Sequence, residues 1–588
     1  MYQWFVVVGS LFAFIYGFGT GSNDVANSFA SSVGSKSLSM KQAMFLAFVF
    51  EFTGALVLGR VSTSTIAGGI ADIKQFSSDP EMYAYGMMIS LGVAGFLQIL
   101  GSYLELNISS THSIIGCIMG FSLVYKGKTG VNWAIPDTKS FPPYKGVVPI
   151  FCSWVFSPLL TAIASATIFL LCRTFVLRRQ NASKKALYVL PIAVFGTTWI
   201  NVYFVLTKGA KKLIDEKDSW SDRKASLIAL FVAIGTTVLT TFTVLPYIIF
   251  KANKKFEINE VQLETLASNT KDDDVENASQ QDTDITSEKA HSYCTPQFTD
   301  FKHSIVTAVK EHFNPDMDSK VEEDELVSAM HRTAEVFEER AEYIFSFLQV
   351  FSAISVVFAH GAGEVGYMAG PLAAIWDYAQ KGVVKKNVEP PIWIILISAS
   401  GLVVGLAAYG QKLTMAMAVK LTKLSPTRGF AAELATATVI MVAAQFGLPT
   451  SSSQCIIGGL VGVGLLEGMK GVNWKFFAAQ AISWVVNLFL SMGIVAAIFA
   501  QGVFSPSIYD SRELNLYESN INLISKDYLK TCNSTLVQQF NTSINPYTIP
   551  LKSLSTSLSL MGKQANPHPY NVLQLLNNTL VYYKNSTC

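Results

Sequence analysis

Runs of mostly apolar residues recur along the 588-residue chain, interrupted by short polar stretches. Most runs have about 17 to 25 residues, enough for a helix to cross roughly 30 Å of hydrocarbon, and so predict membrane-embedded segments. The runs around 109–125 and 450–467 are short and rich in Ser and Gly, which favours re-entrant segments there. The pattern predicts about twelve segments, near residues 4–20, 42–60, 84–101, 109–125, 148–171, 187–206, 226–250, 342–360, 392–410, 430–447, 453–467 and 475–500.

The composition agrees with this pattern. Hydrophobic residues make up 50% of the chain and charged residues 15%, which excludes an ordinary soluble protein. Residues 1–20 have neither a basic n-region nor a small-residue cleavage site, so no cleavable signal peptide is expected. We therefore expect an all-α, polytopic, integral membrane protein.

Two segments lack the apolar pattern and divide the chain. Residues 251–340 are charged, with helical periodicity only near their end, and are expected to form a partly disordered cytosolic loop. They separate a first transmembrane half (1–250) from a second (341–500). The tail (501–588) is expected to be extracellular, because it holds a cysteine pair that a disulfide would join and four glycosylation sequons: Cys532, Cys588, Asn533, Asn541, Asn577 and Asn585.

The distribution of basic loops tests this orientation. With the tail outside and twelve crossings, the N-terminus is outside as well. The basic loops 172–185 and 411–429 then lie in the cytosol, as the positive-inside tendency requires, whereas the basic loop 207–225 lies outside and disagrees. The plasma membrane is the expected location.

The chain also repeats itself. "SSTHSIIGCIMGFSLVYKGKTGVNW" (109–133) matches "SSSQCIIGGLVGVGLLEGMKGVNW" (451–474), and "GSNDVAN" (21–27) aligns more weakly with "GAGEVGY" (361–367). Each of the latter pair follows an apolar run, so each is expected at the end of a helix. An odd number of crossings, seven, separates the two helices, so the copies are inverted. Inverted repeats are typical of alternating-access transporters with a site near the membrane midplane.

The hydroxyl triplets predict an oxyanion site. Each triplet opens a short helix, and a helix N-terminus offers unpaired N–H groups and about half a positive charge. The simpler interpretation, ordinary N-capping by serine, is weakened by the presence of two symmetry-related copies. His112 follows the first triplet where Gln454 follows the second, and both are further candidates. The triplets are Ser109, Ser110 and Thr111, and Ser451, Ser452 and Ser453.

Intramembrane carboxylates predict a cation site. Burying an anion beside Asp24 and Glu364 would be repulsive unless cations or protons accompany it. A carboxylate with the amide oxygens of Asn23 and Asn27 suits a hard cation such as Na⁺. Two further acids inside apolar runs, Glu51 and Glu433, are candidates as well, with interhelical pairing to serine or backbone as the alternative.

These motifs resemble the inorganic phosphate transporter (PiT) family of sodium–phosphate symporters. The resemblance rests on "GSNDVANSF", "SSTHSIIG", "GLPTSSSQ", "FAHG" (358–361) and "SPTRGFAAEL" (425–434), and covers both transmembrane halves. It implies an inverted-repeat fold, phosphate uptake driven by Na⁺ or in some members H⁺, and no enzymatic activity or cofactor. It also implies that Asn23 and Asp24 belong to the cation site. At the matching position of the second copy we add Glu364, so that Na⁺ is expected at the two acids. The phosphate ligands it implies are Asn27, Ser109, Ser110, Thr111, Ser451, Ser452 and Ser453.

The second copy departs from the family pattern G-A-N-D-V-A-N. Gly363, Glu364 and Tyr367 stand where the family has Asn, Asp and Asn, and Asn107 replaces a proline that Pro449 keeps. Proton coupling, and a phosphate-binding sensor with little transport, therefore remain alternatives to sodium symport. A membrane-embedded hydrolase is disfavoured, because no H-x-x-x-H or G-x-S-x-G arrangement is present. Expected partners are phosphate, Na⁺ or H⁺, the lipid bilayer and, as one alternative, a second copy of the chain, but no nucleic acid.

Overall fold

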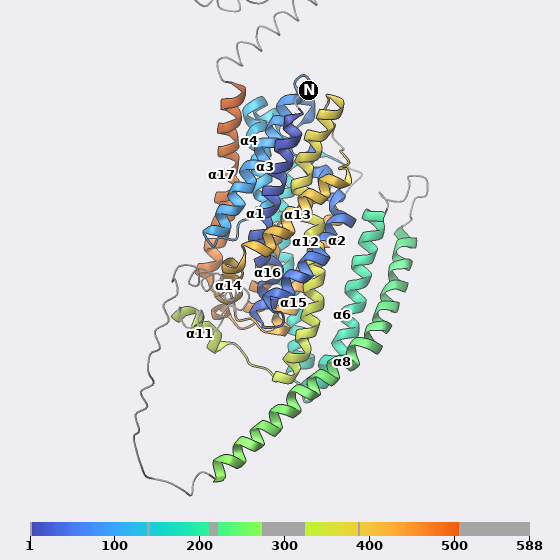
Figure 1. Ribbon diagram of the computed structural model, residues 1–588, viewed down its shortest axis with the longest axis vertical. Helices are drawn as coiled ribbons and strands as arrows, with labels where there is room; N and C mark the ends of the chain where they lie inside the picture. The colour runs from blue at the N-terminus through green and yellow to red at the C-terminus, as the bar shows by residue number, and fades with distance from the viewer. Residues whose placement is uncertain are drawn as a thin grey trace, which may run out of the picture. The chain divides into compact units, whose positions relative to one another are not determined.

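The computed structural model describes residues 3–137, 142–210, 222–272, 321, 324–385 and 388–504. The chain is an all-α polytopic membrane protein (Figure 1). Within the described ranges the strands are β1 (Ile135–Pro136) and β2 (Tyr144–Lys145), which pair antiparallel. The α-helices are α1 (Trp4–Gly34), α2 (Met40–Gly68), α3 (Pro80–Tyr103), α4 (Ser110–Lys126), α5 (Val147–Cys172), α6 (Ala182–Phe204), α8 (Asp222–Asp272), α11 (Glu325–Thr333), α12 (Glu339–Lys381), α13 (Ile392–Ala408), α14 (Gln411–Lys420), α15 (Pro426–Gln445), α16 (Ser452–Leu465) and α17 (Trp474–Val503).

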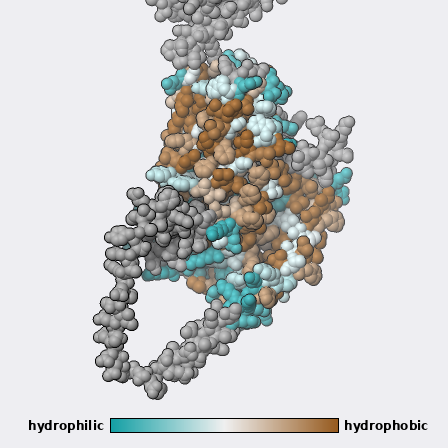
Figure 2. All heavy atoms as spheres, in the orientation of Figure 1, coloured by the Kyte–Doolittle hydropathy of each residue, from teal (hydrophilic) through white to brown (hydrophobic). Residues whose placement is uncertain are grey.

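All twelve predicted runs coincide with helices. In the part of the chain that the structure describes, nine helices are long and apolar enough to cross a membrane. A tenth results if α13 and α14, which meet at a 68° bend, are counted as one span. The helices α4 and α16 are shorter, with 17 and 14 residues, so the number of twelve crossings stays a prediction. Figure 2 shows apolar residues over the visible side of the bundle and hydrophilic residues gathered toward its two ends.

The two polar motifs lie inside helices, which corrects the expectation that each ends a helix. The helix that carries "GSNDVAN" continues to Gly34, and "GAGEVGY" lies within the 43-residue α12. The expectation was wrong because a helix already pairs its own backbone groups, so polar side chains need no loop if neighbouring helices satisfy them. Asp24 and Asn27 find such partners on α12 and at Asn107. Both motifs are therefore held on rigid elements.

Long helices of the two halves pack against each other. The helix α1 packs against α13 and α3, while α12 packs against α2 and α15; in the same way α4 packs against α17 and α16 against α5. Where α12 packs against α2, Gly361 contacts Glu51 and Gly370 contacts Ile66, so these two helices run parallel. Gly9 near the start of α1 lies against Ile375 of α12, whereas Asp24 further along α1 contacts His360, so α1 and α12 run in opposite directions. An inverted repeat requires this direction, although the repeat itself stays a prediction.

Two elements extend outside this paired arrangement. The helices α6 and α8 pack on each other as a pair beside the bundle (Figure 1), and α8 runs on to Asp272, past the expected start of the loop at 251. The helical end expected for that loop is present as α11, whose Val327 and Met330 are buried against α14 and neighbouring segments. The predictions for 273–320 and for the tail, including its disulfide and glycosylation, lie outside the described residues.

Candidate functional site

The N-termini of α4 and α16 meet inside the bundle. Ser109 caps α4 by accepting a hydrogen bond from the His112 N–H (3.3 Å), and Ser451 caps α16 through the Gln454 N–H (3.3 Å). The Ser451 hydroxyl also donates to the Ser109 hydroxyl at 2.9 Å. N-capping, the simpler interpretation of the triplets, therefore operates together with a direct contact between the two helix starts. Their N–H groups and hydroxyls converge on one buried region, which is an arrangement suited to an oxyanion.

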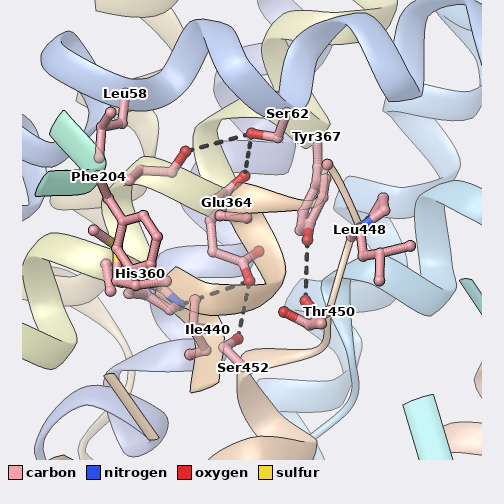
Figure 3. Close-up of a pocket in the computed structure, with 17 residues that line it drawn as sticks. Leu58, Ser62, Phe204, His360, Glu364, Tyr367, Ile440, Leu448, Thr450 and Ser452 are labelled. Atoms are coloured by element: carbon pink, nitrogen blue, oxygen red, sulfur yellow. Dashed lines mark hydrogen bonds and ion pairs between the residues drawn. The ribbon is translucent and has the colours of Figure 1, made fainter. Parts of the chain in front are cut away.

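Glu364 of α12 bridges these helix starts. The Ser110 hydroxyl donates to its Oε2 atom at 2.6 Å, and the Ser452 hydroxyl donates to its Oε1 atom at 2.9 Å. The glutamate is 2% exposed, so both oxygens are satisfied by protein donors in the bundle interior. Figure 3 shows the Glu364 side chain lying between Ser452 and His360.

The third residue of each triplet faces the opposite polar motif. The Ser453 hydroxyl lies 3.5 Å from the Asp24 carboxylate, and the Asn27 amide donates both to this hydroxyl (2.8 Å) and to Asp24 (2.7 Å). Asn107 stands at the position where the family pattern has proline, and its side-chain amide donates to the Oδ1 atom of Asn27 at 2.7 Å. The amide side chains thus fix Asn27 beside the aspartate.

The corresponding contact in the second motif is made by a phenol. Thr111 Oγ1 donates to the Thr450 carbonyl oxygen at 3.3 Å, and the Tyr367 hydroxyl donates to the same oxygen at 3.1 Å. Tyr367 is buried, so its bulk is accommodated in the bundle without exposing the ring. The tyrosine replaces the amide of the family pattern by a single hydroxyl.

His360 connects the acids of the site. Its Nε2 lies 3.2 Å from Asp24 and 3.9 Å from Glu364, and its Nδ1 bonds Glu51 of α2. One ligand atom from each of Asp24, His360 and Glu364 can be chosen so that all three lie within 4.8 Å of one another. Two carboxylates at this spacing fit a hard cation such as Na⁺, which prefers oxygen ligands. His360 is not among the site residues predicted from the sequence, where it enters only the disfavoured hydrolase alternative, although "FAHG" puts it one helical turn before Glu364.

A small cavity of about 50 Å³ adjoins Glu364. Its polar wall is formed by Glu364, His360 and Tyr367, whereas Leu58 and Phe204 contribute to its apolar wall (Figure 3). Phe204 comes from α6, so this outer helix contributes to the apolar wall of the cavity.

Among the described residues, four of the predicted site residues make no side-chain hydrogen bond to this group. Asn23 turns away from Asp24 and donates its amide to the Leu106 carbonyl at 2.9 Å. His112 stacks on Trp154 with ring centroids 3.6 Å apart, and Gln454 contributes the capped N–H of α16.

The fourth, Glu433, forms a separate buried cluster. Its carboxylate accepts hydrogen bonds at 2.6 Å from each of three serine hydroxyls, Ser31, Ser32 and Ser352, and at 3.2 Å from the Gln349 amide. This is the interhelical pairing that the sequence left open for Glu433.

The fold and site together define a polytopic membrane protein with a buried region that presents donors for an oxyanion beside carboxylates for a cation. This chain belongs to the phosphate transporter family, whose family model matches residues 20–495. A phosphate-repressible phosphate permease of Neurospora crassa is 26% identical over 83% of this chain and 95% of its own length. The sodium-dependent phosphate transporter 1-A of Danio rerio is 27% identical over 84% of this chain and 94% of its own length.

A solved structure supports the fold. The sodium-dependent phosphate transporter is 26% identical to this chain, with a TM-score of 0.61, and the similarity covers 84% of this chain and 98% of that one. The expected family resemblance is therefore confirmed, and the relatives are named as transporters or permeases.

Proposed function

We propose that this protein is a secondary active symporter that imports inorganic phosphate together with Na⁺. The observation that carries the proposal is the meeting of two serine-capped helix starts, α4 and α16, directly beside Asp24 and Glu364. Phosphate would accept hydrogen bonds from the hydroxyls and N–H groups of both helix starts, and Na⁺ would be held by the two carboxylates. The names of the sodium-dependent relatives support the choice of cation.

Each ligand needs the other for an electrostatic reason. In a buried region, an added phosphate would repel Asp24 and Glu364, because like charges interact strongly where the dielectric constant is low. A cation between these acids lowers that repulsion, so the two solutes favour each other's binding. Such mutual stabilisation is the thermodynamic basis of symport.

The opposed directions of α1 and α12 suggest how access alternates. Each motif is packed against a helix of the other half, so a rocking of one half against the other would open the site to one side at a time. We further propose that the protein lies in the plasma membrane with its tail outside, as the sequons suggest.

Uptake of radiolabelled phosphate into proteoliposomes tests the proposal. We expect uptake with an inward Na⁺ gradient, little uptake with K⁺ in its place, and loss of uptake in Asp24→Asn, which keeps the shape of the side chain but removes its charge. Equal uptake in Na⁺ and K⁺ would contradict sodium coupling.

Proton coupling is the second candidate, because one observation favours it. His360 contacts Glu51 and Asp24 and lies 3.9 Å from Glu364, so a proton has four adjacent groups to occupy. In the same liposomes, an inward proton gradient without Na⁺ should then drive uptake, and His360→Gln should abolish it. Sodium-driven uptake that ignores the proton gradient would exclude this candidate.

A further inference from the structure

We propose that the Glu364 side chain competes with phosphate for the same hydrogen-bond donors. Its carboxylate accepts hydrogen bonds from one hydroxyl at each helix start until a bound cation attracts it toward Asp24. This inference rests on the proposed symport function and adds to it an order of binding, cation first and phosphate second. It also gives a role to the replacement of the family's aspartate in the second motif.

The hydrogen bonds of Glu364 are those that an oxyanion would use. One carboxylate oxygen accepts from Ser110 at the start of α4, and the other accepts from Ser452 at the start of α16. Charge-assisted hydrogen bonds of this kind are about twice as strong as neutral ones. Phosphate approaching the same two helix starts must therefore displace an anion that the protein itself supplies.

The first motif provides an internal comparison. Its aspartate, Asp24, is one methylene shorter, and of the second triplet it reaches only Ser453, at 3.5 Å. Among the described residues, the other hydrogen-bond partners of its carboxylate are Asn27 and His360, so it does not bridge the two helix starts. The bridging contact thus belongs to the longer side chain, because an additional carbon–carbon bond extends the carboxylate by about 1.5 Å.

The Glu364 carboxylate is also close enough to Asp24 to move toward it and away from the two serine hydroxyls. The Oε1 atom that accepts from Ser452 lies 3.9 Å from His360 Nε2, and this ring nitrogen lies 3.2 Å from Asp24. The carboxylate therefore stands at the border between the oxyanion donors and the acids. A cation bound between Asp24 and Glu364 would attract the carboxylate and release the hydroxyls of Ser110 and Ser452. Cation binding and phosphate binding are then coupled through one side chain, and the coupling must be reciprocal.

Equilibrium binding of radiolabelled phosphate to the detergent-purified full chain tests the inference without requiring transport. In K⁺ medium, we expect Glu364→Asp to bind phosphate at least about tenfold more tightly than the wild type, a factor equivalent to about 1.4 kcal/mol. In Na⁺ medium the two proteins should differ much less, because Na⁺ already withdraws the glutamate in the wild type. Equal or weaker phosphate binding by Glu364→Asp in K⁺ would overturn the inference.

A matched control is available on the same helix. Glu342 is a half-buried glutamate that accepts hydroxyl hydrogen bonds at 3.0 Å from Ser425 and Thr427. Among the described residues, it makes no hydrogen bond with the helix starts of the site. Glu342→Asp should leave phosphate binding in K⁺ unchanged, so a tightening in this variant as well would refute a specific role for Glu364.

The uptake experiment separates this inference from the proposed function. Sodium-driven uptake by the wild type, combined with no tightening in Glu364→Asp, would reject the competitor and retain the symporter. Tightening in Glu364→Asp without sodium-driven uptake would retain the competitor and reject symport. No phosphate binding by either protein in either cation would reject both.

Discussion

Gly361 sets the distance between α12 and α2, and its replacement by alanine should disturb the site without removing any of its polar groups. A Cβ atom at this position would lie 2.1 Å from the Glu51 carbonyl oxygen. Ordinary contacts begin at 3.4 Å, so the two backbones must separate by about 1.3 Å. Overpacking of a well-packed interior typically costs about 1–3 kcal/mol. We expect a loss near the upper end of this range, because the obstructing atom belongs to the backbone and cannot rotate away.

The same displacement reaches the neighbouring residue, His360. Its contact with Asp24 is 3.2 Å long, and an increase of about 1.3 Å would exceed hydrogen-bonding distance. In enzymes a misplacement of about 1 Å can cost on the order of 10²-fold in rate, so we expect Gly361→Ala to lower sodium-driven phosphate uptake at least about tenfold.

Thermal unfolding in detergent and uptake into proteoliposomes measure the two effects. Gly493→Ala on α17 is the control, because a Cβ there meets no atom within 4 Å. The control should keep its uptake and unfold at the same or a slightly higher temperature, since alanine is the better helix former by about 0.5–1 kcal/mol. If Gly361→Ala behaves like Gly493→Ala in both assays, the close approach of α12 to α2 does not position the site.

Two further predictions concern the end of the bundle where α11 packs. Arg428, which is 1% exposed, donates to Glu467 at 2.7 Å, and the Glu467 side chain is 8% exposed. Arg428→Met should therefore leave the Glu467 carboxylate without its charged partner and lower the free energy of unfolding by about 3–5 kcal/mol. Adding Glu467→Gln should recover part of the loss in denaturant unfolding, and no recovery would contradict the pairing. Burial lowers the pKa of His331 on α11. The positive charges of Lys423 and Arg428 also lower this pKa, whereas the hydrogen bond of the ring to a backbone carbonyl raises it and offsets part of the shift. When α11 detaches from the bundle, His331 regains its ordinary pKa of about 6.5 and binds a proton more readily than in the packed helix. The packing of α11 should therefore weaken as the pH falls below that value. Hydrogen exchange of residues 325–333 at about pH 7.5 and 5.5 should show faster exchange at the lower pH, and His331→Gln should remove the difference.

The membrane class and the positions of the helices follow from local properties of the sequence. The length of an apolar run is set by the thickness of the hydrocarbon, so every predicted run coincides with a helix. The ends of those helices were less predictable. A polar motif such as "GSNDVAN" resembles the end of an apolar run. Partners from other parts of the fold, such as His360 of α12 and Asn107, satisfy its side chains and allow α1 to continue through it.

The sequence also identified the chemistry of the candidate site, since the two hydroxyl triplets and the acids of the motifs can be read directly from it. Which of these groups meet was decided by the tertiary structure. Ser109 and Ser451 are 342 residues apart and touch because the folded bundle brings the starts of the two short helices together. The orientation of a helix about its own axis depends on close contacts such as the one at Gly361, which the sequence of one helix does not contain. That orientation turns Glu364 toward both triplets, brings His360 between three acids, and leaves Asn23 and Glu433 in contacts of their own.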